Sequence, residues 1–342
     1  MNRRETLLQL AAAGLALAPA ASAGAETDRL GPVLPRRPLG KTGEQVTCLG
    51  LGGYHIGWVD DEKTVRATIE AALEEGVRFF DNAESYGQGR SEERYGKYLV
   101  PQYRDQVFIM TKTGARDPAT ARAHLEGALS RMKLEMVDLW QLHSLESPDD
   151  ADDRVAKGLL DVALKAREEG KVRYIGFTGH ASPYAHTRMM EHEVAARECV
   201  ACQFPVNPVD AAAKHSFIGT TLPAAQKHGI SVLAMKTLAD GRFFGSKVMN
   251  GKEMWTLDDP VVPDVITIAE CIHFALSLPI TTLITGAENP DLLREKAELV
   301  RAFSKMGAGK RMALAKRVAD FAADGKVEYY KDAALRLPGT TN

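Results

Sequence analysis

The sequence has no excess of either charge, few cysteines and no apolar run long enough to cross a membrane. Its 342 residues include 43 Lys and Arg against 45 Asp and Glu, which gives a formal net charge of −2. No basic surplus indicates nucleic-acid binding, and no acidic tract indicates a disordered tail. The 45% hydrophobic and 26% charged residues are typical of a globular protein, and the length fits one large barrel domain.

The few cysteines and histidines do not form a recognisable metal site. Cys199 and Cys202 make a single Cys-x-x-Cys pair, whereas zinc and iron–sulfur sites need three or four ligands. A redox motif is the other reading of the pair, but both residues lie in the strand-like run CVACQFPV, and we interpret them as buried structural thiols. A metal-dependent barrel hydrolase would need ligands at strand ends, where the chain has no His-x-His pair.

The N-terminal residues 1–25 differ from the rest of the chain. Arg3-Arg4 precedes the alanine-rich apolar run Leu7–Ala20, and a small-x-small cleavage site ends at Ala23. This pattern is typical of a twin-arginine signal peptide. The alternative, a membrane anchor, would need about 20 apolar residues, and this run is shorter and contains a proline. We therefore predict export of the folded protein by the twin-arginine machinery, cleavage near Ala23, and a periplasmic or other extracytoplasmic location.

Eight short apolar runs alternate with helical patterns along the rest of the chain. Apolar runs without strict alternation suit parallel strands that are buried on both faces. Eight strand–helix units indicate a closed barrel rather than an open sheet. We therefore predict an α/β fold, a (β/α)8 TIM barrel. The predicted barrel strands are Val46–Leu51, Val77–Asp81, Val107–Thr111, Met136–Leu142, Val172–Phe177, Cys199–Phe204, Ser231–Met235 and Thr282–Thr285.

Further elements lie at the two ends of this barrel. The stretch Arg36–Gly50 contains a Lys-Thr-Gly-Glu turn and predicts an N-terminal hairpin that plugs the barrel bottom. Amphipathic spacing predicts a helix over Asp61–Glu75, and Asp117-Pro118 marks the start of another helix. Residues Gly309–Gly325 predict one extra C-terminal helix on the outside. The predicted domains are a signal peptide at 1–25, a barrel at 36–325 and a C-terminal tail at 326–342.

Four polar residues follow three successive predicted strands. Asp81 and Tyr86 lie in FFDNAESYG, Lys112 in VFIMTKT and His143 in VDLWQLH. Intervals of about 30 residues fit one strand–helix unit of a parallel barrel, whose C-terminal strand ends meet at one mouth. Each residue alone has an ordinary explanation, as a turn cap, a loop aromatic, a solvated lysine or a core histidine. All four at successive mouth positions predict that their side chains converge.

Such a cluster suits the reduction of a carbonyl. Hydride addition leaves an alkoxide that needs a proton, and a free phenol with a pKa of about 10 is a weak acid at neutral pH. Lys112 beside Tyr86 would stabilise the phenolate and ease proton donation. Asp81 would pair with Lys112, because a lone buried ammonium is costly. His143 would hydrogen-bond the carbonyl oxygen and polarise it.

The sequence resembles the aldo-keto reductases. The resemblance covers about Leu39 to Val300 and rests on PLGKTGEQVTCLGLGG, FFDNAESYGQGRSEE, FIMTKT, VDLWQLH, GKVRYIGFTG, QFPVNP and GISVLAMKTLADG. It implies a (β/α)8 barrel, a nicotinamide cofactor extended across the mouth, and hydride transfer to an aldehyde or ketone. It also implies the same four catalytic roles for Asp81, Tyr86, Lys112 and His143.

The resemblance further implies a nucleotide site, from which this chain departs in places. Thr178-Gly179 stands where the family usually presents Ser-Asn to the nicotinamide, so His180 would have to replace the missing amide. Met235-Lys236 ends the seventh strand, where an aromatic residue commonly stacks on the nicotinamide. The expected nucleotide-binding residues are Gly52, Gly53, Tyr54, Thr178, Gly179, His180, Gln203, Met235, Lys236, Leu238, Gly286, Asn289, Arg294, Glu295 and Lys296.

NADP is the expected nucleotide and NAD the alternative. The predicted helix Asp291–Val300 would present its N-terminus to an anion. Arg294 and Lys296 would supply positive charge for a 2′-phosphate, although Leu292 and Lys296 replace polar residues that the family usually has there.

The sequence thus predicts an exported aldo-keto reductase-type oxidoreductase that acts on a small carbonyl or polyol, with a sugar among the candidates. In the loop Asp240–Pro260, the residues Phe243, Phe244 and Trp255 either line a pocket or pack on the barrel rim. The alternative function is a non-catalytic barrel that binds a nicotinamide nucleotide as a sensor or partner subunit. The complete catalytic set argues against it.

Because an exported enzyme lacks a pool of free nucleotide, we expect the nucleotide to leave with the protein and turn over without dissociating.

Overall fold

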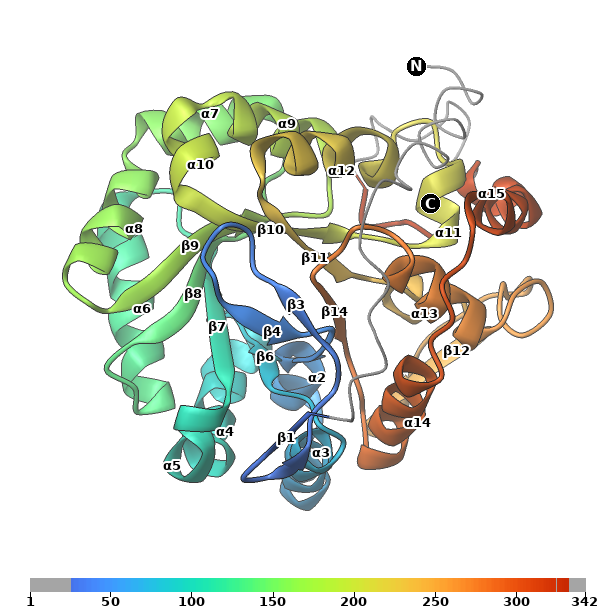
Figure 1. Cartoon of the computed structure of the whole chain (residues 1–342), viewed down its shortest axis with the longest axis horizontal. Coiled ribbons are helices and arrows are strands. Elements are labelled where there is room, and N and C mark those ends of the chain that lie inside the picture. The colour runs from blue at the N-terminus through green and yellow to red at the C-terminus, as the bar shows by residue number, and fades with distance from the viewer. Residues whose placement is uncertain (1–25, 324, 332–342) are drawn as a thin grey trace.

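Eight parallel strands form a closed barrel that is surrounded by helices (Figure 1). The fold is described by a computed structural model that covers residues 26–323 and 325–331. Every neighbouring pair is parallel, so the C-terminal ends of the strands open on one side. The predicted (β/α)8 barrel is confirmed. The strands follow one another around the barrel as β10 (Cys199–Pro205), β11 (Ser231–Met235), β14 (Thr282–Thr285), β5 (Leu49–Gly52), β6 (Phe79–Asp81), β7 (Phe108–Thr113), β8 (Val137–Leu142) and β9 (Val172–Thr178).

The first barrel strand is shorter than predicted, because the run Val46–Leu51 is divided between two sheets. Its first residues belong to β4 (Gln45–Thr47), which pairs antiparallel with β3 (Arg36–Pro38) in the predicted hairpin. The chain bends at Cys48, whose backbone N–H donates to the Pro35 carbonyl at 2.8 Å. β5 therefore begins only after this bend.

Helices cover the outside of the barrel, and further short elements lie at its two ends (Figure 1). The helices are α2 (Gly53–Trp58), α3 (Glu62–Glu74), α4 (Arg90–Tyr98), α5 (Val100–Tyr103), α6 (Pro118–Met132), α7 (Pro148–Ala156), α8 (Leu159–Glu168), α9 (Pro183–Glu191), α10 (Glu193–Glu198), α11 (Pro208–Ala212), α12 (Phe217–His228), α13 (Ile268–Leu276), α14 (Pro290–Arg301) and α15 (Ala308–Arg317). The 3₁₀ turns are η1 (Tyr86–Gly89), η2 (Arg104–Gln106), η3 (Ala239–Gly241) and η4 (Ala319–Ala322). The remaining strands are β1 (Thr27–Asp28), β2 (Gly31–Pro32), β12 (Ser246–Met249) and β13 (Lys252–Thr256).

Several helices after barrel strands begin with the same local sequence, a capping residue followed by proline. Asp117 starts α6, Ser147 starts α7 and Asn289 starts α14, and in each case the side chain accepts a backbone N–H of the first turn. The following proline has no N–H to satisfy and its φ is already helical. This pattern fixes where each loop at the barrel mouth ends and its helix begins.

Apolar side chains fill the barrel from inside and pack the helices onto it from outside. The smaller inner cluster joins Leu39 and Val46 of the hairpin to Phe79, Phe108 and other inward residues of the strands. The rings of Phe79 and Phe108 stack with centroids 5.0 Å apart. The hairpin thus closes the barrel bottom, as predicted, and leaves the opposite mouth for a site.

The C-terminal region differs from the expected long helix and free tail. The helix predicted over Gly309–Gly325 ends earlier, because α15 stops at Arg317 and is followed by η4. Residues 325–331 of the chain then return to the barrel mouth, where Glu328 and Lys331 are buried. The rest of the predicted tail and the whole predicted signal peptide lie outside the described residues.

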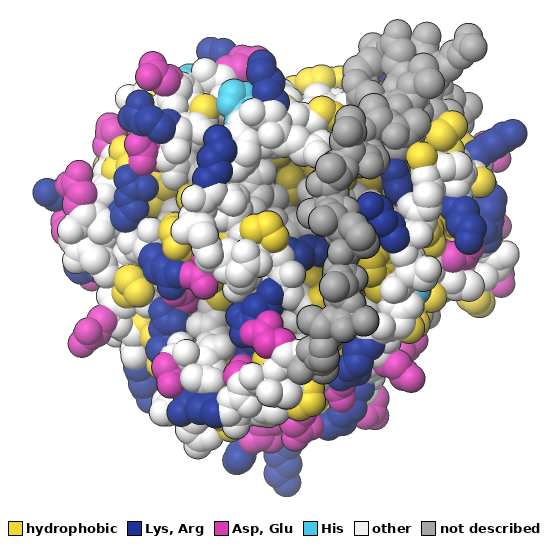
Figure 2. Space-filling view, viewed as in Figure 1, with side chains coloured by type: hydrophobic (Ala, Val, Ile, Leu, Met, Phe, Trp, Pro, Cys, Tyr) yellow, Lys and Arg dark blue, Asp and Glu magenta, His cyan; other side chains and the backbone are white. Residues whose placement is uncertain are grey.

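The surface and the cysteines agree with a balanced globular composition. On the face that carries the β3–β4 hairpin, basic and acidic side chains are interspersed (Figure 2). All four cysteines, including Cys199 and Cys202, are buried free thiols, as the strand position of that pair predicted. None of the helices within the described ranges has the length and apolar character that crossing a membrane requires.

Candidate active site

The four predicted catalytic residues meet at the C-terminal mouth of the barrel. Asp81 is the last residue of β6, Lys112 lies near the end of β7, His143 directly follows β8, and Tyr86 opens η1. The structure therefore brings together the residues that sequence spacing placed at three successive strand ends.

Tyr86 is held in place by a close backbone contact between η1 and α2. A Cβ on Gly57 of α2 would lie 2.8 Å from the Tyr86 carbonyl, and Gly87 has a φ of +60°. A larger residue at Gly57 would push η1 away, and Gly87 adopts its left-handed conformation at little steric cost. The two glycines thus fix the position of the phenol next to α2.

Lys112 is the centre of the cluster. Its Nζ lies 2.5 Å from Asp81 Oδ1 and 3.2 Å from the Tyr86 hydroxyl, and it donates to the Asn82 carbonyl at 2.7 Å. Lys112 and Asp81 are 1% and 2% exposed. An ammonium and a carboxylate so deeply buried stabilise each other only while both are present.

Burial decides the protonation state of the reacting groups. It raises the pKa of Tyr86 well above 10, and the negative charge of Asp81 adds to this rise. It lowers the pKa of His143 well below its ordinary value, and the nearby Lys112 ammonium adds to that fall. At neutral pH the phenol therefore keeps its proton and the imidazole is neutral. The expected effect of Lys112 on the phenol does not outweigh burial in the resting site.

The Lys112–Asp81 pair is itself shifted by burial. Loss of solvent raises the pKa of Asp81 and lowers the pKa of Lys112, and the attraction between them only partly opposes both shifts. The rings of Tyr86 and His143 meet edge to face with centroids 5.9 Å apart. A proton donor and a neutral hydrogen-bonding imidazole thus sit side by side.

Two acids that the sequence reading missed, the buried Glu92 and the partly buried Glu84, support this cluster from behind. Glu92 accepts from the Thr111 hydroxyl at 2.5 Å and pairs with Arg131 at 2.7 Å. Glu84 accepts the backbone N–H of Gly114 at 2.8 Å. Both lie in the segment FFDNAESYGQGRSEE, which was singled out only for Asp81 and Tyr86. These contacts connect α4 to β7 before Lys112, and the loop after β6 to the residue that follows β7.

A cavity of about 820 Å³ opens over the cluster. Asp81, Tyr86, Lys112 and His143 all border it. Most of the expected nucleotide-binding residues also line it, which places both sets in one continuous space. These are Gly52, Tyr54, Thr178, His180, Gln203, Met235, Lys236, Leu238, Gly286, Asn289, Glu295 and Lys296.

Three expected nucleotide-binding residues do not line this cavity. A Cβ on Gly53 would lie 2.5 Å from the Asp81 carbonyl, and one on Gly179 would lie 2.5 Å from the Leu145 carbonyl, so both glycines serve close backbone packing. Arg294 was expected to face the nucleotide, but its guanidinium points to α3, where it pairs with Glu74 at 3.2 Å. The structure thus places these three residues away from the cavity wall.

Buried polar atoms without partners mark the inner end of the cavity. Within the described residues, Gln203 Oε1 is buried and has no hydrogen-bond partner. Thr178 Oγ1 donates to the Gln203 carbonyl at 3.0 Å, so this hydroxyl is already engaged. His180 Nδ1 lies 3.1 Å from the Tyr330 carbonyl, and burial followed by the charge of Lys236 lowers the His180 pKa to about 4. A neutral His180 therefore carries its proton on Nδ1 and offers Nε2 as an acceptor.

Charged groups gather at the other end of the cavity, beside the start of α14. Lys296 Nζ donates to the Gly286 carbonyl at 2.5 Å. His55 pairs with Glu288 at 3.1 Å, and its Nε2 lies 3.4 Å from Lys247 Nζ. Burial acts to raise the pKa of Glu288, but the bond from His55 together with the nearby positive charges of His55, Lys296 and Lys247 outweighs it, and the pKa falls to about 2. Sequence reasoning missed His55, Lys247 and Glu288, which no spacing rule connects.

The β12–β13 hairpin crosses the mouth and is fastened to α2. Asn250 at its tip donates to the Trp58 carbonyl at 2.9 Å and accepts the Asp60 N–H at 3.0 Å. Of the aromatic residues noted in this loop, Phe244 lines the cavity and Phe243 is fully buried. Trp255 packs on Arg242, whose guanidinium lies 4.5 Å from the ring centroid. We refer to the two hydrogen bonds of Asn250 as the hairpin latch.

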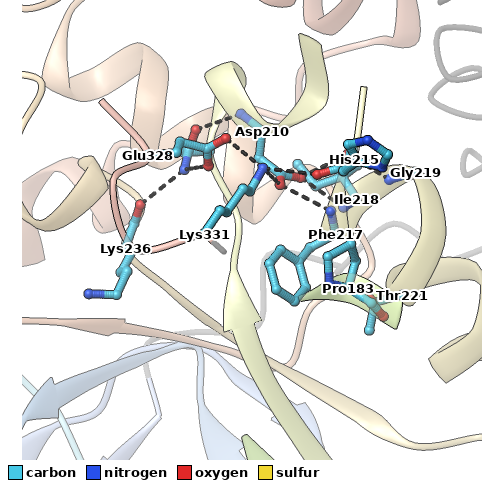
Figure 3. Close-up of polar contacts among 12 residues, drawn as sticks. Pro183, Asp210, His215, Phe217, Ile218, Gly219, Thr221, Lys236, Glu328 and Lys331 are labelled. Carbon is cyan, nitrogen blue, oxygen red and sulfur yellow. Dashed lines mark hydrogen bonds and ion pairs between the residues drawn. The ribbon is translucent and has the colours of Figure 1, made fainter. Parts of the chain in front are cut away.

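The C-terminal segment 327–331 borders the site on another side, and Figure 3 shows the polar contacts of its residues Glu328 and Lys331. Lys331 Nζ pairs with Asp210 at 2.7 Å and with Glu328 at 2.6 Å. Tyr330 contributes its carbonyl to His180 and its ring to the Lys236 ammonium, which lies 4.8 Å from the ring centroid. Tyr329 and Tyr330 both line the cavity. No motif pointed to this segment, because it is tied to the mouth by contacts between residues far apart in sequence.

In the portion of the chain that the structure describes, no group of three or more His, Cys, Asp or Glu residues is placed to hold a metal ion. The geometry therefore consists of a protonated phenol, a neutral imidazole and a buried ammonium–carboxylate pair in a deep cavity.

Comparisons with known proteins agree with this geometry. A sequence model of the "Aldo/keto reductase family" matches residues 48–327. An "Uncharacterized oxidoreductase YrpG" of Bacillus subtilis is 30% identical over 232 residues, which are 60% of this chain and 67% of that protein. The "L-galactose dehydrogenase" of Arabidopsis thaliana is 31% identical over 156 residues, 42% of this chain and 48% of that protein. A solved "aldo-keto reductase AKR11C1 from Bacillus halodurans (holo form)" has the same fold, with a TM-score of 0.68, 21% identity, and coverage of 83% of this chain and 96% of that one.

Proposed function

We propose that this chain, which belongs to the aldo/keto reductase family and is an NAD(P)-dependent oxidoreductase, uses Tyr86 as the general acid and base. The observation that carries the proposal is the position of Lys112 Nζ, 2.5 Å from Asp81 Oδ1 and 3.2 Å from the Tyr86 hydroxyl, at the wall of one cavity. The reaction interconverts a carbonyl and an alcohol.

Each side chain then has a defined task. When bound, the nicotinamide supplies or accepts the hydride. Tyr86 holds the proton that the developing alkoxide requires, because burial keeps the phenol protonated until the reaction begins. Lys112, fixed by Asp81, stabilises negative charge as it develops on the phenol oxygen. His143 is neutral and donates a hydrogen bond to the substrate oxygen, which orients the carbonyl.

The residues of the cavity fit a nicotinamide nucleotide. Gln203 Oε1, which has no partner among the described residues, and His180 Nε2 offer two acceptors for the amide of the nicotinamide. At the other end, the N-terminus of α14 with Lys296 and Lys247 suits phosphate groups. Met235 takes the place of a stacking aromatic and can pack against the ring through its sulfur.

NADP is the proposed nucleotide, with NAD as the alternative. With Arg294 turned toward α3, the positive charge for a 2′-phosphate has to come from Lys247 and Lys296. Glu288 opposes such binding, since its pKa of about 2 keeps it ionised. Titration of protein from which the bound nucleotide has been removed, with each nucleotide in turn and followed by intrinsic fluorescence, measures the preference. At least about tenfold tighter binding of NADP is expected, and equal or tighter binding of NAD would contradict this choice.

We further propose that the protein is exported by the twin-arginine route and keeps its nucleotide bound. The signal lies outside the described residues, so support comes from the sequence Arg3-Arg4 and from the hairpin latch, which must open before a bound nucleotide can leave. Arg3→Lys/Arg4→Lys is expected to leave folded, unprocessed protein in the cytoplasm. Normal appearance of the mature form outside the membrane would contradict the export proposal.

The substrate is proposed to be a small carbonyl or polyol, with a sugar among the candidates. A turnover assay follows reduced nicotinamide absorbance while the protein is mixed with short aldehydes, hydroxyaldehydes and, in the reverse direction, polyols. Turnover that Lys112→Met abolishes is the expected result. Absence of turnover in both directions with nucleotide-loaded protein would contradict the proposed chemistry.

A further inference from the structure

The loop after β11 holds its residues in an unusual backbone conformation at the edge of the cavity. Lys236, Ala239 and Asp240 have φ values of 52°, 48° and 60°, in the left-handed region that residues with a Cβ avoid. Such strain persists only where the surroundings hold it, and it often presents a functional side chain. Here the left-handed turn directs two charged residues, Lys236 and Asp240, into the cavity lining.

The Asp240 carboxylate is only partly engaged by the protein. Its Oδ2 accepts from the Tyr329 hydroxyl at 2.5 Å and lies 3.8 Å from Lys236 Nζ. Its Oδ1 forms no hydrogen bond with any residue in the described part of the chain, and Asp240 borders the cavity. Burial acts to raise the Asp240 pKa, but Lys236 and Tyr329 outweigh it, so the group is ionised. A charged acceptor therefore faces the space where ligands bind.

Tyr329 is positioned by the buried ionic anchor of the C-terminal segment. Figure 3 shows Lys331 between Asp210 and Glu328, and Asp210 also accepts the backbone N–H groups of Phe217 and Ile218 at the start of α12. This anchor joins the C-terminal segment to α11 and α12. Tyr329, two positions before Lys331, is thereby held against Asp240.

A second contact holds Tyr329 from the side of the β12–β13 hairpin. The Arg242 guanidinium lies between two rings, 4.8 Å from the Tyr329 centroid and 4.5 Å from the Trp255 centroid. Stacked guanidinium and aromatic planes favour a fixed arrangement. The C-terminal segment and the hairpin thus meet at the same rim of the cavity, which the Asp240–Tyr329 pair lines.

We propose that Asp240 and Tyr329 form a hydroxyl-binding subsite that selects a polyhydroxylated carbonyl or polyol as substrate. This inference rests on the proposed function and names its substrate class. Asp240 Oδ1 accepts a substrate hydroxyl, and the Tyr329 hydroxyl, which donates to Oδ2, holds the carboxylate in position for it. An unsubstituted aliphatic aldehyde leaves the carboxylate without this partner after water is displaced, which is unfavourable.

The hydroxyl groups belong to the substrate and not to a ribose of the nucleotide. Lys236 Nζ lies 3.8 Å from Asp240 Oδ2 and 4.8 Å from the centroid of the Tyr330 ring, and the Tyr330 carbonyl lies 3.1 Å from His180 Nδ1, so the carboxylate belongs to the same end of the cavity as His180. The ribose remains the other source of such hydroxyls, and the experiment separates the two by measuring nucleotide affinity alongside turnover.

The test compares D-erythrose with butanal, two four-carbon aldehydes that differ in hydroxyl groups, in wild type, Asp240→Asn and the control Asp259→Asn. Asp259 is exposed in the same loop. For wild type we expect kcat/KM at least about tenfold higher with erythrose. Asp240→Asn should lower kcat/KM for erythrose about 10- to 100-fold, the value of one charge-assisted hydrogen bond, and change butanal less than about threefold. The nucleotide Kd and the control should stay at the wild-type values.

Three results would overturn the inference. Equal losses with both aldehydes would show that Asp240 acts on the fold or the chemistry, and an unchanged erythrose preference would show that it touches no hydroxyl. A nucleotide Kd that rises as much as kcat/KM falls would assign Asp240 to the ribose. If wild type reduces neither aldehyde, the proposed reaction fails separately. Calorimetric binding of erythritol to nucleotide-loaded protein then decides the subsite, which requires weaker binding in Asp240→Asn than in wild type.

Discussion

Two buried lysines, Lys112 and Lys331, have opposite roles although each pairs with an aspartate. Lys331 Nζ donates to Asp210, Glu328 and the His215 carbonyl at 2.7, 2.6 and 3.1 Å. Burial acts to lower the Lys331 pKa, but the two carboxylates outweigh it and the pKa is raised. This ammonium is a fixed structural charge.

Lys112 is compensated by less negative charge than Lys331. One of its contacts, the Tyr86 phenol, can also gain or lose a proton. Among the described residues, Asp81 is the one carboxylate that pairs with Lys112. The other two contacts of Lys112 Nζ are the Asn82 carbonyl and the Tyr86 phenol, which lies 3.2 Å away. Burial therefore prevails and its pKa is lowered. The comparison teaches that a buried ion pair stabilises a fold where protein groups satisfy it fully, and can serve chemistry where one contact is left to a reacting group.

The largest expected effect is on stability, and it separates the two lysines. Lys331→Met leaves two carboxylates buried, and Asp210 is held in place by backbone N–H groups, so we expect a loss of about 3–5 kcal/mol in the free energy of unfolding. Lys112→Met leaves only Asp81, whose pKa burial already raises, so this acid takes up a proton and the loss is smaller, about 1–3 kcal/mol. Urea denaturation of both variants measures the difference.

A double variant sharpens this result. Asp81→Asn/Lys112→Met should be more stable than the sum of the two single losses implies, because the second change removes the group that the first leaves without a partner. Strict additivity would contradict the pairing, and a Lys112→Met loss as large as that of Lys331→Met would remove the contrast between the two sites.

A somewhat smaller change in the free energy of unfolding is expected when the pH is lowered. It arises from His186, a buried histidine outside the catalytic cluster. His186 is fully buried, and burial lowers its pKa to about 4. As the pH falls below about 6.5, His186 is protonated in the unfolded chain, whereas in the folded chain it stays neutral until about pH 4. Stability is thus complete above pH 6.5 and declines toward pH 4 by about 3 kcal/mol, at 1.36 kcal/mol per pH unit.

Chemical denaturation at several pH values measures this decline, and His186→Gln should flatten it. Glutamine can still donate to the Gln203 carbonyl, which lies 3.2 Å from His186 Nε2. Identical slopes for wild type and variant would assign the pH dependence to other groups, such as His143 and His180.

The smallest effect concerns the hairpin latch and the retention of nucleotide. Asn250→Ala removes two hydrogen bonds, one to Trp58 at the end of α2 and one to Asp60 just beyond it, each contributing about 1 kcal/mol, so nucleotide release should be about 5- to 30-fold faster. Stopped-flow fluorescence measures the release, with the exposed neighbour Lys252→Ala as the control. An unchanged release rate would mean that the latch does not hold the nucleotide. Rapid exchange already in wild type would contradict the bound-nucleotide proposal.

The barrel and the catalytic cluster could be read from sequence because both follow local order along the chain. Eight apolar runs recur with the period of a strand–helix unit. Asp81, Lys112 and His143 each end one of these runs or directly follow it, and Tyr86 lies in the loop five residues after Asp81. Strand direction alone then brings them to the same mouth. The helix after the last barrel strand was also predicted, as Asp291–Val300, within one residue of the observed α14 at each end.

The rest of the site depends on contacts that sequence order does not encode. Arg294 was assigned to the nucleotide from its place on α14, but helix rotation turns it to Glu74, while Leu293 faces the core. The latch of Asn250 and the anchor of Lys331 join segments far apart in the chain, and neither has a sequence pattern. In the turn that ends at Gly241, the left-handed residues Lys236, Ala239 and Asp240 are not glycines, so their residue types do not mark their backbone conformation.

The central claim is that Tyr86 donates the proton under the control of Lys112, and a single-turnover measurement tests it most directly. Nucleotide-loaded Tyr86→Phe and wild type are mixed with an aldehyde that wild type reduces, and nicotinamide absorbance follows one hydride transfer. Tyr98→Phe, which removes a phenol on the outer helix α4, is the control. We predict a rate lower by about 10²–10⁴ in Tyr86→Phe, with nucleotide affinity and unfolding free energy unchanged. A Tyr86→Phe rate within about threefold of wild type would contradict the account.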